Sequence, residues 1–307
     1  MTIDVHKAYM KCVVSGGTGF IGRRIVRSLL DRNHYVGVWS RRPGREERDA
    51  VASFSWDPLQ GEPPLDSLNT MDAVIHLAGE PVAQRWNSAV KARIRDSRVQ
   101  GTRHLVDAIG RVQHRPKVLI CASAIGFYGD RGNEVLTEQS GQGSGFLAEC
   151  CQAWENEAGR AAIFGLRVIK LRIGFVLGPD GGALARMIPA FRALAGGKLG
   201  SGKQWMPWIH VDDVASMFVH AVENNIEGVW NATAPNPVTN KTFTKELAHI
   251  LGRPAIFPIP GLALKLAFGE LGQHMLDSAR VIPEAATAAG FPFRFPDLGA
   301  ALRDIVK

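Results

Sequence analysis

The sequence contains little cysteine, and its spacing does not match a disulfide framework or a metal site. Four cysteines occur among 307 residues, Cys12, Cys121, Cys150 and Cys151, with no Cys-x-x-Cys pair. Cys12 and Cys121 lie in apolar runs that predict core strands, and Cys150 and Cys151 are neighbours, which rarely bond to each other. We therefore expect reduced thiols, no bound metal and a cytoplasmic protein.

Long hydrophobic runs are also absent. The first ten residues lack the apolar core of a signal peptide, and no uncharged apolar run approaches the roughly 18 residues of a membrane helix. Hydrophobic residues make up 46% of the chain and charged residues 21%, which is typical of a globular protein. The sequence predicts no association with a membrane.

The basic excess is modest and lacks the pattern of a nucleic-acid site. Lysine and arginine number 36 against 29 acidic residues, a net charge of +7. Several of the early arginines fall on a predicted surface helix, and no basic stripe is interleaved with aromatic residues. We expect no nucleic-acid partner.

The stretch 11–22, KCVVSGGTGFIG, is the most informative in the chain. A short apolar run leads into four glycines, and apolar residues then recur at helical spacing up to residue 30. A strand, a glycine turn and a helix in this order predict a dinucleotide-binding turn. Glycine permits the tight turn, the approach of a pyrophosphate and the close packing of helix on strand, and the first N–H groups of the helix face the phosphates.

The end of the next predicted strand, 35–40, indicates which dinucleotide. In such folds an acidic residue at this place holds the free 2′-hydroxyl of the adenosine ribose, whereas arginine holds a 2′-phosphate. Here Ser40, Arg41 and Arg42 offer a hydroxyl and two guanidinium groups and no carboxylate. We predict NADP(H) rather than NAD(H).

Three further polar residues have a structural and a functional interpretation. Asp57 follows the third predicted strand and either accepts from the adenine amino group or begins a turn. His76 alternates with apolar neighbours, which is typical of a core or cofactor-edge histidine. Arg98 lies within the long predicted helix 88–109, and it either binds the pyrophosphate or pairs with a surface carboxylate.

The alternation of predicted strands and helices gives the fold class. Apolar runs at 71–77, 117–123 and 167–171 alternate with helical patterns, as in an α/β protein with a Rossmann-like, doubly wound parallel sheet. We expect a dinucleotide-binding domain at 10–180 that also includes about 208–232. A smaller C-terminal substrate lobe, 181–307, is interleaved with it. The segment 200–210 is expected to be a loop.

By these motifs the chain resembles an extended short-chain dehydrogenase/reductase over nearly its whole length. The motifs are GGTGFIG at 16–22, HLAG at 76–79, ASAIGFYG at 122–129, RIGFVLGP at 172–179 and WIHVDDVA at 208–215. It is similar in particular to the atypical epimerase/dehydratase-like subfamily, through Gly79-Glu80, Arg85-Trp86, Ser97-Arg98, Trp154-Glu155 and 181–184. Many extended members form homodimers through two helices beside the sheet, and their commonest cargo is a nucleotide-sugar. The resemblance therefore implies a small-molecule substrate and is compatible with a homodimer.

The usual proton-transfer pair of this superfamily is missing. Its chemistry uses Tyr-x-x-x-Lys, in which the lysine lowers the pKa of the tyrosine. The chain has three tyrosines, and none is followed four residues later by lysine. The companion serine position holds Ala124, and Ser123 lies one place early. This departure agrees with the atypical subfamily.

Two hypotheses about function follow. In the first, the chain is an NADP(H)-dependent epimerase or oxidoreductase with different acid/base residues. In the second, it binds NADP(H) without turnover, as a sensor or scaffold. The combined loss of the tyrosine, the lysine and the serine favours the second. The aromatic segment 205–208, which looks like a substrate lid, favours the first. Tyr128 has an alternative role in packing, and His210 has one as a helix cap. The candidate proton carriers are Tyr128, Asp130, Glu149, Cys150, Cys151, Glu155, His210 and Asp212.

The residues and the resemblance together define a predicted cofactor site with no metal. It consists of Gly16, Thr18, Gly19, Phe20, Ile21, Gly22, Ser40, Arg41, Arg42, Asp57, Leu77, Ala78, Gly79, Arg98, Ala122, Ser123, Arg172, Gly174 and Val176.

Overall fold

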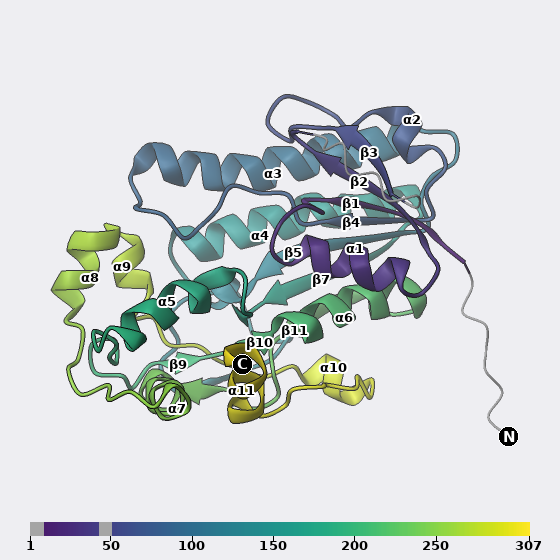
Figure 1. The fold of residues 1–307 in the computed structure, drawn as a ribbon. Coiled ribbons are helices and arrows are strands. Elements are labelled where there is room, and N and C mark those ends of the chain that lie inside the picture. The colour runs from purple at the N-terminus through teal and green to yellow at the C-terminus, as the bar shows by residue number, and fades with distance from the viewer. Residues whose placement is uncertain (1–8, 43–50) are drawn as a thin grey trace, which may run out of the picture.

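The computed structural model describes residues 9–42 and 51–307, and its centre is a seven-stranded sheet (Figure 1). All neighbouring strands in it are parallel, in the order β11-β7-β5-β4-β1-β2-β3. The strands are β1 (Lys11–Ser15), β2 (Tyr35–Ser40), β3 (Val51–Ser55), β4 (Ala73–His76), β5 (Val118–Ala124), β7 (Arg167–Ile173) and β11 (Gly228–Ala232). The order steps outward from β1 in both directions, which is the doubly wound α/β topology that the sequence predicts.

Helices cover both faces of this sheet (Figure 1). On one face lie α2 (Leu65–Leu68), α3 (Ser88–Arg111) and α4 (Phe146–Gly159), and on the other lie α1 (Gly22–Leu30) and α6 (Val211–Glu223). Strand β4 is buried at all four residues because both of its faces are covered. Short 3₁₀ turns, Ile125–Tyr128 and Arg160–Phe164, follow β5 and α4.

The C-terminal part of the chain forms a smaller lobe beside the carboxyl ends of the strands (Figure 1). It has an apolar cluster of its own, which includes Leu184, Trp208, Phe243 and Leu302. Its helices are α5 (Gly182–Arg192), α7 (Asn240–Leu251), α8 (Gly261–Phe268), α9 (Leu271–His274), α10 (Glu284–Ala288) and α11 (Leu298–Val306). The main sheet takes its last strand, β11, from a segment that follows α5 in sequence.

Three small two-stranded sheets complete the fold, and they correct one prediction. The segment 200–210, expected to be a loop, contains β9 (Trp205–Met206) and β10 (Trp208–His210). Strand β9 pairs with β12 (Val238–Thr239), and β10 pairs with β8 (Phe175–Leu177). The third sheet joins β6 (Val135–Leu136) to β13 (Arg280–Val281). Strands of two or three residues are too short to show a period of two, so the sequence gives no signal for them.

All four cysteines lie in the described part of the chain. All four thiols are free and buried. Among the described helices, none combines the length and the apolar character needed to cross a bilayer.

Candidate cofactor and active site

The glycine turn between β1 and α1 has the geometry of a phosphate-binding loop. Gly16 has φ +70°, a left-handed conformation that favours glycine. A Cβ on Gly22 would overlap the carbonyl oxygen of Gly16, so only glycine lets the helix pack this close to the strand. Among the described residues, none accepts a hydrogen bond from the backbone N–H of Phe20 or Ile21. These donors at the start of α1 are free for an anion.

Arg98 lies at the carboxyl end of β4 without a carboxylate partner among the described residues. Its Nη1 donates to the carbonyl oxygens of Glu80 (3.0 Å) and Ile94 (3.1 Å). A Cβ on Gly79 would come within 3.2 Å of the guanidinium carbon, so this glycine makes room for it. Burial lowers the pKa of Arg98. The surface ion pair that was one alternative for Arg98 is not formed with any carboxylate in the part of the chain that the structure describes, and the remaining N–H groups are available to a ligand.

The Ser97-Arg98 pair also holds the loop that follows β4. Ser97 Oγ accepts from the backbone N–H of Glu80 at 2.9 Å, beside the Arg98 contact to the carbonyl oxygen of the same residue. Together they fix the Gly79-Glu80 dipeptide in place.

A cavity of about 330 Å³ lies where the adenosine end of a dinucleotide is predicted. Arg41 and Asp57 both line it. Asp57 Oδ1 also accepts from the backbone N–H of Leu59 (3.1 Å), so the turn alternative for Asp57 is formed as well. Ser40 Oγ is buried and has no hydrogen-bond partner among the described residues. Arg42 is exposed beside Arg41. The full lining is Arg41, Ser55, Trp56, Asp57, Gln60, Gly61, Glu62 and Pro64.

A buried polar network occupies the carboxyl ends of β5, β7 and β11. Glu155 on α4 pairs with Arg172 on β7 through two hydrogen bonds, Nε to Oε1 (2.8 Å) and Nη2 to Oε2 (2.9 Å). Ser123 Oγ donates to the same Oε1 at 2.6 Å. Arg172 Nη1 donates to the hydroxyl of Tyr128 (3.0 Å), which lies 2.7 Å from Asn231 Oδ1. These five residues are each at most 4% exposed.

This network changes the chemistry of two candidate proton carriers. Both carboxylate oxygens of Glu155 are committed to the ion pair. Burial raises the pKa of the Tyr128 phenol, and the charge of Arg172 offsets this only in part. Burial disfavours the charge of Arg172, but its hydrogen bonds and charge pairing with Glu155 raise its pKa overall. No tyrosine among the described residues hydrogen-bonds a lysine, so the usual dyad is not assembled from distant parts of that portion of the chain.

The remaining candidates divide into structural and exposed groups. His210 Nδ1 accepts from the backbone N–H of Asp212 (3.1 Å) and caps α6, which is the structural alternative named for it. Burial raises the pKa of the Cys151 thiol to about 12, and it raises that of Cys150 too. Asp212 pairs with Arg24 at 2.7 Å. Asp130 and Glu149 are exposed, and Asp130 Oδ1 accepts from the backbone N–H of Ser278.

The other predicted cofactor residues lie along the same edge of the sheet. The N–H groups of Leu77 and Ala78 donate to Ser15 Oγ (3.1 and 3.2 Å), and Ala122 is buried in β5. Thr18 and Gly19 belong to the glycine turn, and Val176 pairs with Ile209. A Cβ on Gly174 would crowd the carbonyl oxygen of Pro207 at 2.6 Å.

Phe20 connects the glycine turn to the second lobe. Its ring occupies the space that a Cβ on Gly181 would need, and it also lies against Gly178 and Gly182. Next to it, Arg23 pairs with Asp180 at 2.7 Å.

His76 is a core residue. Ser15 Oγ already accepts from two backbone N–H groups, so it donates to His76 Nδ1 at 2.7 Å, and Nε2 donates to Thr102 Oγ1 at 3.1 Å. Burial lowers the pKa of His76 to about 3, so the ring is neutral.

Comparison with known proteins agrees with this geometry. Residues 12–232 match the NAD dependent epimerase/dehydratase family. The chain belongs to that family. Residues 259–305 of this family member match a second module, a domain of unknown function (DUF1731).

The similarity to individual relatives covers almost the entire chain. This chain is 40% identical, over 98% of its length, to the "Epimerase family protein SDR39U1 homolog, chloroplastic" of Arabidopsis thaliana, and the match covers 88% of that protein. It is 37% identical to the Bacillus subtilis "Epimerase family protein YfhF" over 97% of this chain and 98% of that one. The crystal structure of "human epimerase family protein SDR39U1 (isoform2) with NADPH" superposes with a TM-score of 0.86 at 34% identity, covering 96% of this chain and 99% of that one.

Sequence reasoning did not identify two polar residues of this epimerase-family site. Asn231 holds the Tyr128 hydroxyl and donates from Nδ2 to the carbonyl oxygen of Ile282 (3.0 Å). Glu138 accepts from the backbone N–H of Asn231 at 2.8 Å. The only available signal for Asn231 was a polar residue in the otherwise apolar strand GVWNA.

Proposed function

We propose that this epimerase family protein binds NADP(H) along the carboxyl edge of the sheet and acts on a small molecule that is still to be identified. The free N–H groups at the start of α1 and the Arg98 guanidinium would hold the pyrophosphate. Ser40, Arg41 and Arg42 would hold the 2′-phosphate, and Asp57 would face the adenine. The observation that carries the proposal is Arg98, a partly buried cation at the sheet edge with no carboxylate partner among the described residues.

Support for the cofactor comes from this chain and from a relative. The buried, unpartnered hydroxyl of Ser40 would gain an acceptor in a 2′-phosphate. Arg41 lines the adjoining cavity. The human relative was crystallised with NADPH.

When bound, the cofactor supplies hydride exchange at its nicotinamide ring. The chain's own contribution is a fixed polar network, since the Glu155–Arg172 pair holds Ser123 and Tyr128 in place at the carboxyl ends of the strands. Asp130 and Glu149 are the candidate carboxylates that stay accessible to solvent, so we propose one of them as the proton carrier.

A direct test compares NADPH and NADH in fluorescence titrations. The double variant Arg41→Ala/Arg42→Ala should weaken NADPH binding at least about tenfold and leave NADH binding within about twofold. The matched control is Arg27→Ala/Arg192→Ala, which removes two exposed charges elsewhere. Equal affinity of the wild type for NADPH and NADH would contradict the assignment of the 2′-phosphate site.

The second candidate function is binding without turnover. It is favoured by the commitment of Tyr128 and Glu155 to internal contacts. Mass spectrometry of the small molecules that co-purify distinguishes the two candidates. An enzyme should retain a second metabolite or convert one in a mixture, and Asp130→Asn or Glu149→Gln should abolish that conversion. Release of the dinucleotide alone, with no metabolite consumed, would favour the binder.

We also propose a cytoplasmic protein that forms a homodimer and has no nucleic-acid partner. Light scattering after size exclusion measures the oligomeric state, and a monomeric mass would contradict the dimer.

A further inference from the structure

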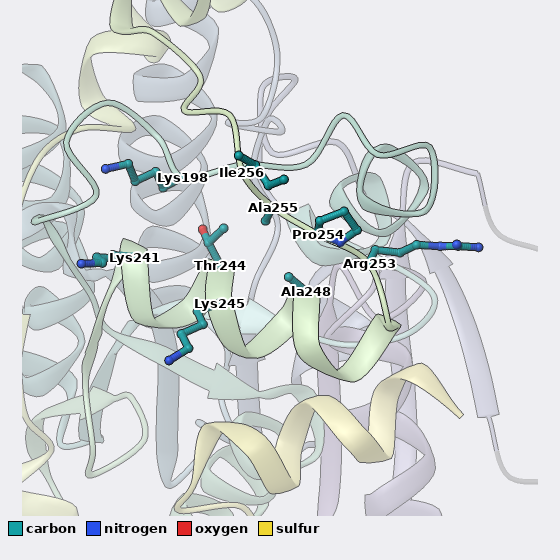
Figure 2. A pocket seen from close by; sticks show the side chains of 9 residues that line it. All are labelled: Lys198, Lys241, Thr244, Lys245, Ala248, Arg253, Pro254, Ala255 and Ile256. Carbon is teal, nitrogen blue, oxygen red and sulfur yellow. The ribbon is translucent and has the colours of Figure 1, made fainter.

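A second cavity, of about 370 Å³, lies in the C-terminal lobe (Figure 2). Helix α7 forms one wall, the segment 253–256 forms another, and Lys198 stands at the opening. Helix α7 packs on α11, α5, β9 and β12. The cavity shares no lining residue with the glycine turn or with the cavity beside Asp57. We call it the α7 cavity. It is lined by Lys198, Lys241, Thr244, Lys245, Ala248, Arg253, Pro254, Ala255 and Ile256.

The lining carries four cationic side chains and no acidic one. None of Lys198, Lys241, Lys245 and Arg253 has a carboxylate within ion-pair distance among the described residues. Among the described residues, the only polar contact of their charged ends is a weak one, from Lys198 Nζ to the carbonyl oxygen of Ser201 (3.4 Å). Figure 2 shows Lys198 and Lys241 extending to one side of the cavity and Arg253 to the other, so these side chains would turn inward to meet a ligand. Four unpaired like charges around one cavity favour an anion.

Thr244 supplies an independent observation at the floor of the α7 cavity. The residue is 3% exposed, and its buried Oγ1 has no hydrogen-bond partner within the described ranges 9–42 and 51–307. A helical threonine often donates to the carbonyl oxygen one turn earlier, and here it does not. Figure 2 shows the hydroxyl pointing from α7 toward Lys198 and Ile256. An unmade hydrogen bond of this kind costs free energy that a bound acceptor would recover.

The α7 cavity also has an apolar part. Pro254, Ala255 and Ile256 lie on the wall opposite α7, next to Arg253, and Ala248 lies on α7 itself. This volume is large for a bare phosphate ion, and an apolar wall does not bind one. The combination suits an anion with an attached organic part.

We propose that the α7 cavity binds a small organic phosphate, with its phosphoryl oxygens on Thr244 and the surrounding cations and its organic part on the wall formed by Pro254–Ile256. The site does not depend on the proposed dinucleotide function, because it shares no residue with the predicted cofactor site.

The test uses phenyl phosphate in calorimetric titrations of the full chain at low salt, with phenol as the uncharged analogue. The wild type should bind phenyl phosphate saturably and phenol not at all. Lys245→Gln/Arg253→Gln should raise the dissociation constant at least about tenfold. The matched control Arg27→Gln/Lys265→Gln removes one arginine and one lysine outside the cavity and should change it less than about twofold.

Thr244→Val separates binding from folding. It deletes an unpartnered hydroxyl at nearly constant volume, so the melting temperature should not fall while phenyl phosphate binding weakens about fivefold. Absence of saturable binding by the wild type would overturn the proposal. An equal loss of phenyl phosphate affinity in Lys245→Gln/Arg253→Gln and in Arg27→Gln/Lys265→Gln would also overturn the proposal. Such a result would indicate attraction to the net charge of the protein.

A lipid headgroup could supply the same phosphoryl chemistry, and vesicles distinguish the source. Co-sedimentation with phosphatidylglycerol vesicles but not with phosphatidylcholine, lost in Lys245→Gln/Arg253→Gln, would assign the cavity to a headgroup. Saturable phenyl phosphate binding without co-sedimentation would assign it to a soluble ligand.

Discussion

The Glu155–Arg172 pair allows a quantitative prediction for one substitution, Glu155→Gln. Both side chains are at most 5% exposed, and the carboxylate accepts two hydrogen bonds from the guanidinium and one from Ser123. The variant keeps the size of the side chain and removes its charge. The amide oxygen can accept from one guanidinium N–H, but the amide NH2 would face the other. Arg172 would otherwise keep the Tyr128 hydroxyl, the Tyr128 ring and the ring of Phe127, whose centre lies 3.4 Å from the guanidinium carbon.

Breaking a buried pair on one side leaves an uncompensated charge and costs about 3–5 kcal/mol. For a chain of this length, an unfolding entropy of about 2.1 cal/mol/K per residue converts that cost into a fall in Tm of about 5–8 °C. Urea unfolding followed by tryptophan fluorescence should show the same loss as a lower midpoint with an unchanged slope.

Two controls show whether the stability cost of Glu155→Gln comes from the burial of the ion pair or from the loss of any ion pair. Glu157→Gln, two residues along α4, removes a carboxylate that pairs with the partly exposed Arg103 and Arg160 and should cost less than about 1 kcal/mol. Glu155→Leu/Arg172→Met removes both buried charges and should recover most of the stability lost in Glu155→Gln. A cost of Glu155→Gln no larger than that of Glu157→Gln would refute the reasoning.

Three further predictions concern the core of the first lobe. His76 is neutral in the folded protein, because its pKa is lowered from 6.5 to about 3. Its contribution to the free energy of unfolding is therefore complete above pH 6.5. Below that pH, stability should fall by up to about 1.4 kcal/mol per unit, more steeply than in His76→Gln. Gly22→Ala should cost about 2–3 kcal/mol in urea because its Cβ overlaps the Gly16 carbonyl, whereas Gly141→Ala, with open space around it, should change stability by less than about 0.5 kcal/mol. Cys121 and Cys151 should resist thiol reagents until the chain unfolds, because burial raises the pKa of both thiols, and rapid labelling of the native protein at neutral pH would contradict this.

The fold could be predicted from the sequence wherever neighbouring residues determine the structure. The turn 16–22 needs a left-handed Gly16 and a side-chain-free Gly22, and both requirements lie within seven residues. The parallel strands are continuous apolar runs because helices cover both faces. The apolar run at 35–40 predicts a strand, and β2 (Tyr35–Ser40) has these ends.

The polar network could not be predicted, because it depends on how distant elements meet. Glu155 and Arg172 pair only because the register of α4 places one carboxylate opposite the end of β7. The sequence marked Glu155 as a proton carrier and Arg172 as a cofactor residue, and it gave no indication that they neutralise each other. Asn231 joins them from β11, more than 50 residues further along.

The position of Phe20 links the two halves of the molecule. Its ring fills the space beside Gly178, Gly181 and Gly182, and the neighbouring Arg23 and Arg24 of α1 both pair with Asp180. A displacement of the C-terminal lobe would therefore also displace Phe20, whose backbone N–H would bind the dinucleotide. Such a linkage is reciprocal. A metabolite that repositions that lobe would change the affinity for the dinucleotide by some factor, and the dinucleotide would change the affinity for the metabolite by the same factor.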